Sequence, residues 1–462
     1  MKPLSKLFRL PAHLNRLARQ GMEGDWSLHL HKPAVRILAA YSTPDTELLA
    51  DGSLDVAPTR LSAFRVPLAG WVVPRSGSVK GISILCNEYE VASAALELAR
   101  PDVAHHLNNL PGAEQSGFRA EVKTLGLDAH FTLDIYALLD DDRRALLGRV
   151  ECSQELLRPA YKPELNPILV TFIGRTGSTW LMRLLSEHPQ IVIDTRYPYE
   201  TRPLLYWLHV LRVLSAPADH KRSTYPTHFT ENEYWVGHNP FFTPDTIDDD
   251  ALLYWMGQKS VQHLASLCLL NVDRFYRHLK RRQERKKAIY FAEKSVYSTT
   301  SRLAWQLYLR PREIVLVRDP RDVFASVQSF NAKRGTQGFK SDLYSTPEAY
   351  LHFLNLITTR QARIHRANPD QTYLLHYEDL ILHPQETLEA VFRYLKVEAA
   401  PGVVAEVIRR ASQDTPEMQQ HRTTTSPASS IGRWRHDLTP EMQATAAAVL
   451  GNILAELNYP LS

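Results

Sequence analysis

The sequence predicts an α/β protein in three layers, with helices on both faces of a parallel sheet, preceded by a small β-sandwich. Residues 168–173 form an apolar, β-branched run, and residues 312–317, which read Arg-Glu-Ile-Val-Leu-Val, form a second run typical of a buried strand; a helical pattern follows each of them. Before residue 155, short alternating segments separated by turn residues predict the antiparallel part. The chain therefore places an antiparallel unit before a parallel one.

The first part of the chain alternates between apolar and polar residues over short segments, which is typical of a sandwich. Its expected strands are residues 79–85, 118–125, 131–138 and 146–152. A proline-containing linker at residues 158–163 ends this part. We therefore predict a β-sandwich domain over residues 25–160 and a second domain over residues 161–462.

Composition narrows the class of protein. Lys plus Arg number 54 against 50 Asp plus Glu, and the net charge of +4 is small for 462 residues, so nothing indicates a nucleic-acid partner. Cys86, Cys152 and Cys268 are widely spaced, form neither a disulfide framework nor a metal-ligand pattern, and suit a reducing compartment. No apolar run is long enough for a membrane span or a secretory signal. We expect a soluble, cytoplasmic protein.

The first 24 residues form a basic N-terminal tail. Before its first acidic residue, Glu23, the tail carries Lys2, Lys6, Arg9, Arg16 and Arg19. A basic arm can bind an anionic membrane surface, so peripheral membrane contact is one interpretation of this tail. A frayed or packed chain end is the other interpretation.

A glycine loop follows the strand expected at residues 168–173. It reads Gly174-Arg175-Thr176-Gly177-Ser178-Thr179, and the helix after it ends before Pro189. A strand, a glycine loop and a helix start direct backbone N–H groups and the positive end of a helix dipole at one place, where an anion binds favourably. We therefore predict a P-loop-like fold with a phosphate or sulfate cradle. The alternative is a turn that uses its glycines only for packing.

The position of the cation argues against a nucleotide triphosphatase. The phosphate loop of those enzymes places a Lys directly after its last glycine. Here Ser178 follows Gly177, and the cation, Arg175, precedes that glycine. A nucleotide kinase or triphosphatase therefore stays only as an alternative class of function.

A second loop, residues 318–326, follows the strand expected at residues 312–317. Asp319 suits the N-cap of the next helix, and Pro320 suits its first position. Arg318 stands at the end of the strand, and Ser326 lies further along the helix. A guanidinium group can bind a phosphate through two parallel hydrogen bonds, and a hydroxyl can donate a third. The alternative is a surface arginine with an ordinary helical serine.

The two loops together resemble those of sulfotransferases, the enzymes that use 3′-phosphoadenosine 5′-phosphosulfate (PAPS). The first loop, with Arg175, its hydroxyl residues and Trp180, resembles their 5′-phosphosulfate loop. Arg318 and Ser326 resemble the pair that binds the 3′-phosphate in that family. The resemblance covers about residues 165–460. It implies PAPS as the co-substrate, 3′-phosphoadenosine 5′-phosphate (PAP) as the product, and no metal.

The resemblance also implies three catalytic residues. Arg175 and Lys294 would neutralise charge that develops on the sulfuryl and bridging oxygens, while Glu200 would accept the proton of the acceptor hydroxyl. The stretch that begins at Glu200 resembles one in tyrosylprotein sulfotransferases; alternatively, Glu200 is a surface acid paired with Arg202. Cytosolic members of the family place a His just beyond the lysine, where this chain has Ser295, so the role of base falls on Glu200.

The residues implied in binding PAPS extend beyond the two loops. They are Gly174, Arg175, Thr176, Gly177, Ser178, Thr179, Trp180, Arg318, Ser326, Tyr377, Arg433 and Trp434. Tyr377 follows a strand expected at residues 372–376 and would contact the adenine, unless it packs in the core. Arg433 and Trp434 belong to a stretch that resembles the C-terminal loop closing over the nucleotide.

Residues 204–285 form an aromatic-rich helical insertion in the second domain. Its aromatic residues include Tyr206, Trp207, Tyr234, Trp235, Phe241, Phe242, Tyr254 and Trp255. Aromatic side chains over an active site can stack on sugar rings or bind a phenol. We predict that the insertion caps the acceptor site; the alternative is ordinary helix packing.

Three short stretches of the first domain resemble an accessory β-domain that accompanies bacterial glycosyltransferase-type enzymes. They are Gly70-Trp71, residues 100–103 and residues 116–118. That resemblance implies docking to a glycan or a partner, unless the domain only stabilises or dimerises the enzyme. We therefore predict a sulfotransferase acting on a hydroxyl of a carbohydrate or glycoconjugate, with a protein tyrosine as the alternative acceptor. A non-catalytic glycan-binding protein on the same fold is the alternative of another class.

Overall fold

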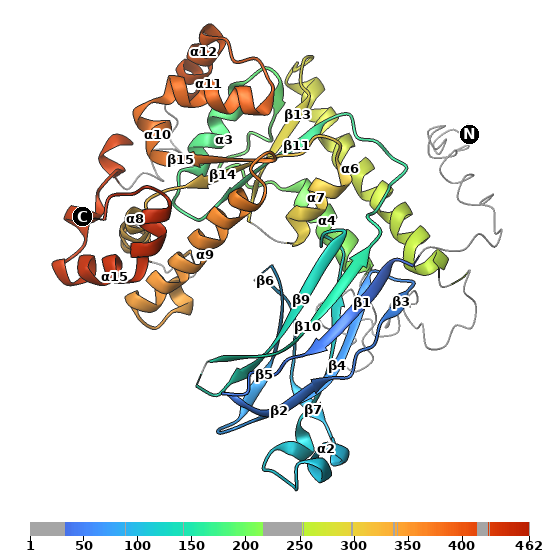
Figure 1. Cartoon of the computed structure of the whole chain (residues 1–462). Coiled ribbons are helices and arrows are strands. Elements are labelled where there is room, and N and C mark those ends of the chain that lie inside the picture. Colours follow the sequence, from blue (N-terminus) through green and yellow to red (C-terminus); the bar gives the residue numbers. More distant parts are fainter. Residues whose placement is uncertain are drawn as a thin grey trace, which may run out of the picture.

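The computed structural model describes residues 33–87, 89–141, 143–215, 252, 254–296, 299–335, 338–339, 341–413, 424 and 426–461. The predicted basic tail and the central aromatic residues of the insertion, Tyr234, Trp235, Phe241 and Phe242, lie outside the described residues. The ribbon divides into two lobes, an antiparallel β lobe and an α/β lobe (Figure 1).

Five parallel strands form the sheet of the α/β lobe, in the order β12-β13-β11-β14-β15. The strands are β11 (Asn166–Phe172), β12 (Ile191–Val192), β13 (Tyr290–Ser295), β14 (Arg312–Val317) and β15 (Thr372–His376). The first of them in the chain, β11, is central and pairs with β13 on one side and with β14 on the other. Because the strands are parallel, the loops that follow β11, β13 and β14 leave the same edge of the sheet.

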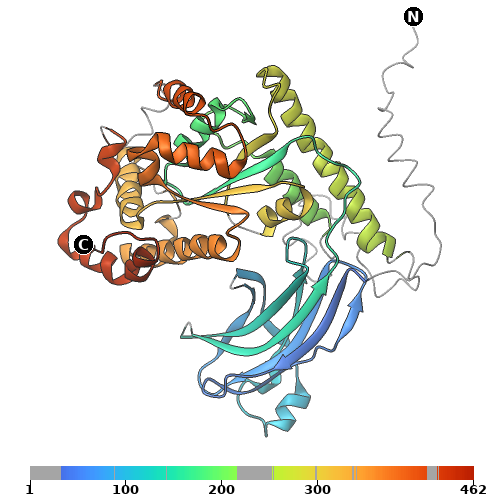
Figure 2. The ribbon, with the colours of Figure 1, turned by 45° about the horizontal axis from the view of Figure 1, so that its top comes forward.

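Helices cover both faces of this sheet, which confirms the predicted three-layer fold (Figure 2). On one face, Ile168 and Val170 share a core with α3 (Ser178–Glu187), α10 (Tyr377–Leu382), α11 (Pro384–Leu395) and α12 (Pro401–Ala411). The other face carries α4 (Pro203–Leu214), α6 (Ser260–Arg282) and α7 (Thr299–Leu307) over one half, and α8 (Pro320–Arg334), α9 (Pro347–Ala367) and α15 (Pro440–Glu456) over the other. None of the described helices has both the length and the apolar character that a membrane span requires.

The β lobe consists of two antiparallel sheets, one of six strands (β3-β1-β10-β9-β5-β6) and one of four (β2-β4-β8-β7). Their bounds are β1 (Val35–Ser42), β2 (Leu49–Leu54), β3 (Thr59–Leu61), β4 (Arg65–Pro74), β5 (Val79–Cys86), β6 (Tyr89–Ala94), β7 (Leu96–Leu98), β8 (Gly117–Lys123), β9 (His130–Leu139) and β10 (Arg144–Gln154). In β9, Phe131, Leu133 and Ile135 are buried at every second position, as a strand with one face on the core requires. The inward residues of the two sheets belong to one apolar core.

That core continues into the α/β lobe, so the two lobes are packed together. It includes Leu169 of β11 and Phe291 of β13, together with the inner faces of α4, α6 and α7. The linker between the lobes is itself bound to α6, because the Tyr161 hydroxyl donates a hydrogen bond of 2.6 Å to Asp273. Across the same junction, Gln306 of α7 donates to the backbone oxygen of Leu127 at 2.6 Å.

The described helices of the aromatic-rich insertion, α4 and α6, pack at this junction. Trp207 of α4 packs against the core shared by the lobes. Gly257 lies so close to the β lobe that an added Cβ would come within 2.5 Å of the Ser62 carbonyl oxygen. These contacts show ordinary helix packing for part of the insertion, whereas Tyr206 of α4 is 64% exposed, so the acceptor cap stays a prediction.

Candidate active site

The glycine loop joins β11 to α3 and adopts a left-handed backbone at two places. Gly177 has a φ of 86° and Arg175 a φ of 69°. At Gly177 an added Cβ would lie 2.4 Å from the Tyr377 ring, and at Gly174 it would lie 2.3 Å from the Phe339 ring. Glycine is therefore required at both positions by close packing, and at Gly177 also by its backbone conformation.

The start of α3 has the properties of an anion cradle. Ser178 and Thr179 are its first two residues, and their amides donate to no other group among the described residues. Thr176, which was predicted to bind PAPS, does not line the cavity. Its amide donates to the Ile173 oxygen at 3.3 Å, its hydroxyl donates to the same oxygen at 2.7 Å, and its side chain is buried. Thr176 therefore holds the shape of the loop from behind.

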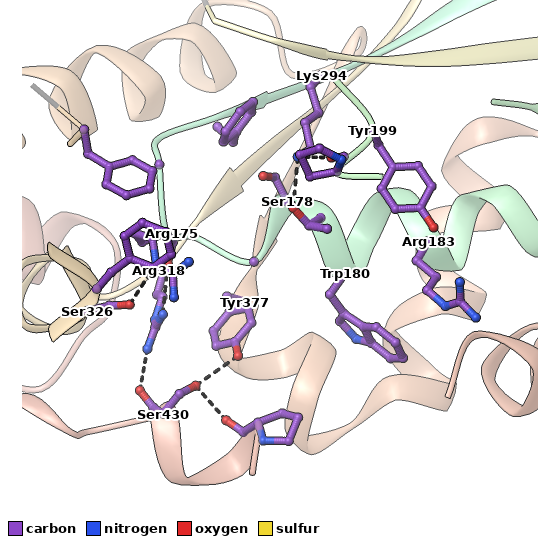
Figure 3. A pocket seen from close by; sticks show the side chains of 18 of the residues that line it. Arg175, Ser178, Trp180, Arg183, Tyr199, Lys294, Arg318, Ser326, Tyr377 and Ser430 are labelled. Atoms are coloured by element: carbon purple, nitrogen blue, oxygen red, sulfur yellow. Dashed lines mark hydrogen bonds between the residues drawn. The ribbon is translucent and has the colours of Figure 1, made fainter. Parts of the chain in front are cut away.

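A cavity of about 700 Å³ opens at the carboxyl edge of the sheet (Figure 3). Most of the residues predicted from the sequence line it: Gly174, Arg175, Gly177, Ser178, Thr179, Trp180, Glu200, Lys294, Arg318, Ser326 and Tyr377. Sequence reasoning missed Phe330 and Arg334, which also line the cavity. They lie four and eight residues beyond Ser326 in α8, a spacing that places all three on one helix face and could have identified them.

Arg175 connects the two predicted loops. Its Nε donates a hydrogen bond of 3.1 Å to the Ser326 hydroxyl, and its guanidinium carbon lies 4.6 Å from the centre of the Phe330 ring. Burial lowers the pKa of Arg175 to about 10, and the nearby charges of Arg318 and Arg433 contribute to this decrease. The group is still protonated at neutral pH, so several positive charges gather where the loops meet.

Arg318 lies beneath this contact. One terminal nitrogen donates to the Arg175 carbonyl oxygen at 2.9 Å, and the other donates to the Ser430 carbonyl oxygen. Its guanidinium carbon lies 4.7 Å from the centre of the Tyr377 ring, whose hydroxyl is 2.9 Å from the Ser430 hydroxyl. The Nε of Arg318 is buried and has no hydrogen-bond partner among the described residues. Tyr377 is thus both a cavity residue and a packing partner of Arg318.

Lys294 enters the cavity from the end of β13. Its ammonium group donates to the Thr179 hydroxyl at 2.9 Å and to the Pro198 carbonyl oxygen at 2.7 Å, and it lies 3.4 Å from a carboxylate oxygen of Glu200. Burial lowers the pKa of Lys294 to about 8, although Glu200 opposes this effect. The lysine therefore connects the glycine loop with the turn that carries Glu200.

Glu200 is half exposed at the rim of the cavity. One of its carboxylate oxygens faces Lys294, and the other lies 3.5 Å from a terminal nitrogen of Arg202. The structure thus combines the two interpretations of this residue, as a cavity carboxylate and as the partner of Arg202. In the described part of the chain, no group of three or more His, Cys, Asp or Glu side chains is placed to hold a metal ion.

The two predicted C-terminal residues do not line the cavity. The Arg433 side chain bonds Asp437 at 2.7 Å. The Trp434 ring is buried, with the guanidinium carbons of Arg321 and Arg435 at 4.0 and 4.4 Å from its centre. The C-terminal stretch instead reaches the cavity through Thr424, Pro427 and Ser430. Arg433 and Trp434, which were expected to contact the nucleotide, therefore lie behind the residues that line the cavity.

The fold and the cavity define a three-layer α/β protein with a cavity at the carboxyl edge of its parallel sheet that is lined by cationic side chains. A model described as the sulfotransferase family matches residues 167–401, which is half of the 462 residues. The chain therefore belongs to the sulfotransferase family.

Solved structures show more distant similarity. A sulfotransferase domain from the curacin biosynthetic pathway is 14% identical, with 66% of this chain and 100% of that chain covered and a TM-score of 0.37. A sulfotransferase from Alicyclobacillus acidocaldarius is 15% identical, with coverages of 65% and 95% and a TM-score of 0.33. A mouse sulfotransferase complexed with PAP is 11% identical, with coverages of 64% and 87% and a TM-score of 0.34. No curated protein sequence matches the chain.

Proposed function

We propose that this sulfotransferase moves the sulfuryl group of PAPS to an acceptor hydroxyl and releases PAP. The observation that carries this proposal is the convergence of cationic side chains from three neighbouring strands on one cavity. Arg175 and Arg318 follow β11 and β14, Lys294 belongs to the end of β13 between them in the chain, and all three line the cavity beside the amides at the start of α3. Such a set suits a co-substrate with a sulfated phosphate at one end and a second phosphate at the other.

Sulfuryl transfer is chemically similar to phosphoryl transfer, in which a loose, in-line transition state depends on positioning and charge stabilisation. The acceptor oxygen forms a bond to sulfur, and the bond between sulfur and the bridging oxygen breaks. The amides of Ser178 and Thr179 would hold the 5′-phosphate, while Arg175 and Lys294 would stabilise the charge on the sulfuryl and bridging oxygens. Glu200 would accept the acceptor proton.

Our first candidate for the acceptor is a carbohydrate hydroxyl, because short stretches of the β lobe resemble an accessory domain of bacterial glycosyltransferase-type enzymes. A protein tyrosine is the second candidate, because the arrangement of Arg175 and Glu200 resembles that of tyrosylprotein sulfotransferases. The test is a screen of saccharides, glycoconjugates and tyrosine peptides with radiolabelled PAPS. We expect label in a saccharide product together with stoichiometric PAP. Binding of PAP without transfer to any acceptor would indicate a non-catalytic protein, and turnover of ATP in place of PAPS would indicate a nucleotide kinase or triphosphatase.

Arg318→Ala should weaken PAP binding by about 10- to 100-fold, because a hydrogen bond to a charged group typically contributes about 1.5–3 kcal/mol. Calorimetry with PAP and with adenosine 5′-phosphosulfate, which lacks the 3′-phosphate, separates the role of the side chain in binding from its role in packing. We expect the affinity for adenosine 5′-phosphosulfate to be nearly unchanged. Equal losses for both ligands would mean that Arg318 only supports the loops through the Arg175 and Ser430 carbonyls.

The pH dependence should report the ionisation of Lys294. Since burial lowers its pKa from 10.5 to about 8, the ammonium is lost as pH rises through that value, and kcat/KM should fall. The corresponding decrease in kcat should occur at higher pH, because the negative charge of bound PAPS favours the ammonium form. Steady-state profiles from about pH 6.5 to about pH 10 test this. A kcat/KM that stays constant over this range would contradict the assignment.

A further inference from the structure

We propose that Glu293, on strand β13, is a positioning residue. It caps the start of α4, the helix that follows Glu200, and thereby holds Glu200 in place. The proposal rests on the proposed function, because Glu200 matters as the acceptor base. Glu293 belongs to β13, is 1% exposed, and is not one of the residues that line the cavity. It can act on the reaction only through the residues that it contacts.

The start of α4 depends on Glu293. Arg202 occupies the N-cap position but makes no capping hydrogen bond with its side chain, and the first helical residue is a proline without an N–H group. The next two amides both donate to Glu293. The Leu204 amide lies 2.6 Å from one carboxylate oxygen, and the Leu205 amide lies 3.3 Å from the other. A carboxylate from outside the helix therefore supplies the cap that the local sequence lacks.

Glu293 and Lys294 act on the same turn from opposite faces of one strand. Consecutive strand residues point to opposite faces, so Lys294 enters the cavity while Glu293 faces α4. The Lys294 ammonium group binds the Pro198 carbonyl oxygen at 2.7 Å, and the Glu293 carboxylate binds the Leu204 amide at 2.6 Å. Glu200 lies between these two attachment points. The position of its carboxylate beside Lys294 is thus determined at both ends by β13.

The capping role requires an ionised carboxylate. Besides the two amides, the Tyr276 hydroxyl donates to Glu293 at 2.7 Å, and the Tyr276 ring is stacked on Phe291 at 3.9 Å. Three donors around one side chain suit a group that only accepts hydrogen bonds. Burial raises the pKa of Glu293 to about 7, while the Leu204 amide and the Tyr276 hydroxyl favour the charged form. Glutamine has nearly the same shape, but its NH₂ group would face a donor.

The test compares Glu293→Gln with a matched control, Glu313→Gln. Glu313 is also 1% exposed, its pKa is also raised to about 7 by burial, and it lies on β14 of the same sheet. Its carboxylate accepts from the Thr171 hydroxyl, far in sequence from the turn that carries Glu200. We expect Glu293→Gln to lower kcat about 10- to 100-fold and to change the Kd for PAP less than about threefold. The control should keep kcat within about threefold of wild type.

A double-mutant cycle with Glu200→Gln tests whether Glu293 acts through Glu200. If it does, Glu293→Gln should change the residual kcat of the Glu200→Gln enzyme by less than about twofold. An equal loss in both backgrounds would overturn the proposal. If Glu293→Gln folds poorly, Glu293→Asp replaces it in the test. This variant keeps the charge and should retain more of the wild-type kcat than Glu293→Gln does.

Hydrogen exchange provides a readout that does not depend on activity. Exchange of the Leu204 and Leu205 amides should become at least about tenfold faster in Glu293→Gln and stay unchanged in the control. Unchanged exchange in Glu293→Gln would overturn the proposal. If the wild-type protein transfers no sulfuryl group from PAPS, the proposed function fails, whereas the exchange result still decides whether Glu293 caps α4.

Discussion

Arg175→Ala is expected to lower kcat by about 10²–10³, the loss that follows removal of one preorganised donor to a developing charge. The affinity for PAP should change less than about fivefold, because the amides of Ser178 and Thr179 and the Arg318 side chain remain. Arg175 is suited to this role by its half-buried place in the cavity lining and by its hydrogen bond to Ser326, which holds the guanidinium in the cavity before the co-substrate binds.

Single-turnover kinetics and calorimetry with PAP separate the two quantities. Alanine and arginine meet the same steric restriction at a φ of 69°, so the backbone conformation of the loop is not relaxed by this change. Arg175→Lys keeps the charge but loses the fork of parallel donors, and an intermediate kcat is expected. Arg310→Ala, an exposed arginine outside the cavity lining, is the control. Full activity in Arg175→Ala would end the catalytic assignment.

Glu200→Gln should lower kcat by roughly 10²–10⁴, the usual contribution of a general base. The amide keeps the size of the side chain but cannot take the acceptor proton. The Kd for PAP should be nearly unchanged, because Glu200 lies at the rim, beside Lys294 and Arg202. The loss should shrink for an acceptor whose hydroxyl is already ionised at the assay pH, since no proton then has to be removed.

Comparison of acceptors with different hydroxyl pKa values tests this dependence. Glu151→Gln, an exposed change on β10 of the other lobe, controls for the substitution itself. A uniform loss across all acceptors would show that Glu200 acts by holding Lys294 instead of by accepting a proton. Wild-type kcat in Glu200→Gln would remove the residue from the mechanism.

Local sequence was sufficient to predict the strands β11, β14 and β15 and the two loops that follow β11 and β14. A parallel strand buried on both faces is mostly apolar, so β11 and β14 could be recognised from their runs of branched residues, although β14 begins with Arg312 and Glu313. The start of α8 could be predicted equally well from Asp319 followed by Pro320. In the structure Asp319 is the N-cap and accepts a hydrogen bond of 2.9 Å from the Arg321 amide. Each of these features depends on residues within one element.

The start of α4 shows the opposite case. Its cap, Glu293, lies 89 residues beyond Leu204 in the chain, and no pattern near Pro203 points to it. Trp434 was predicted to bind the nucleotide, yet it packs between two arginines. An aromatic side chain suits either environment equally, and only the path of the chain around it decides between them.

By itself, the sequence determined the order of the strands along the chain, the glycine loop and the cations at the strand ends, because local backbone geometry and burial restrict which residues can stand there. Tertiary structure alone decided that Arg175 meets Ser326, that α4 and α6 join the two lobes, and that β13 holds the turn of Glu200 from both sides. The physical reason is that hydrogen bonds and packing between distant segments depend on which surfaces meet, and hydrophobic periodicity carries no information about the partner surface.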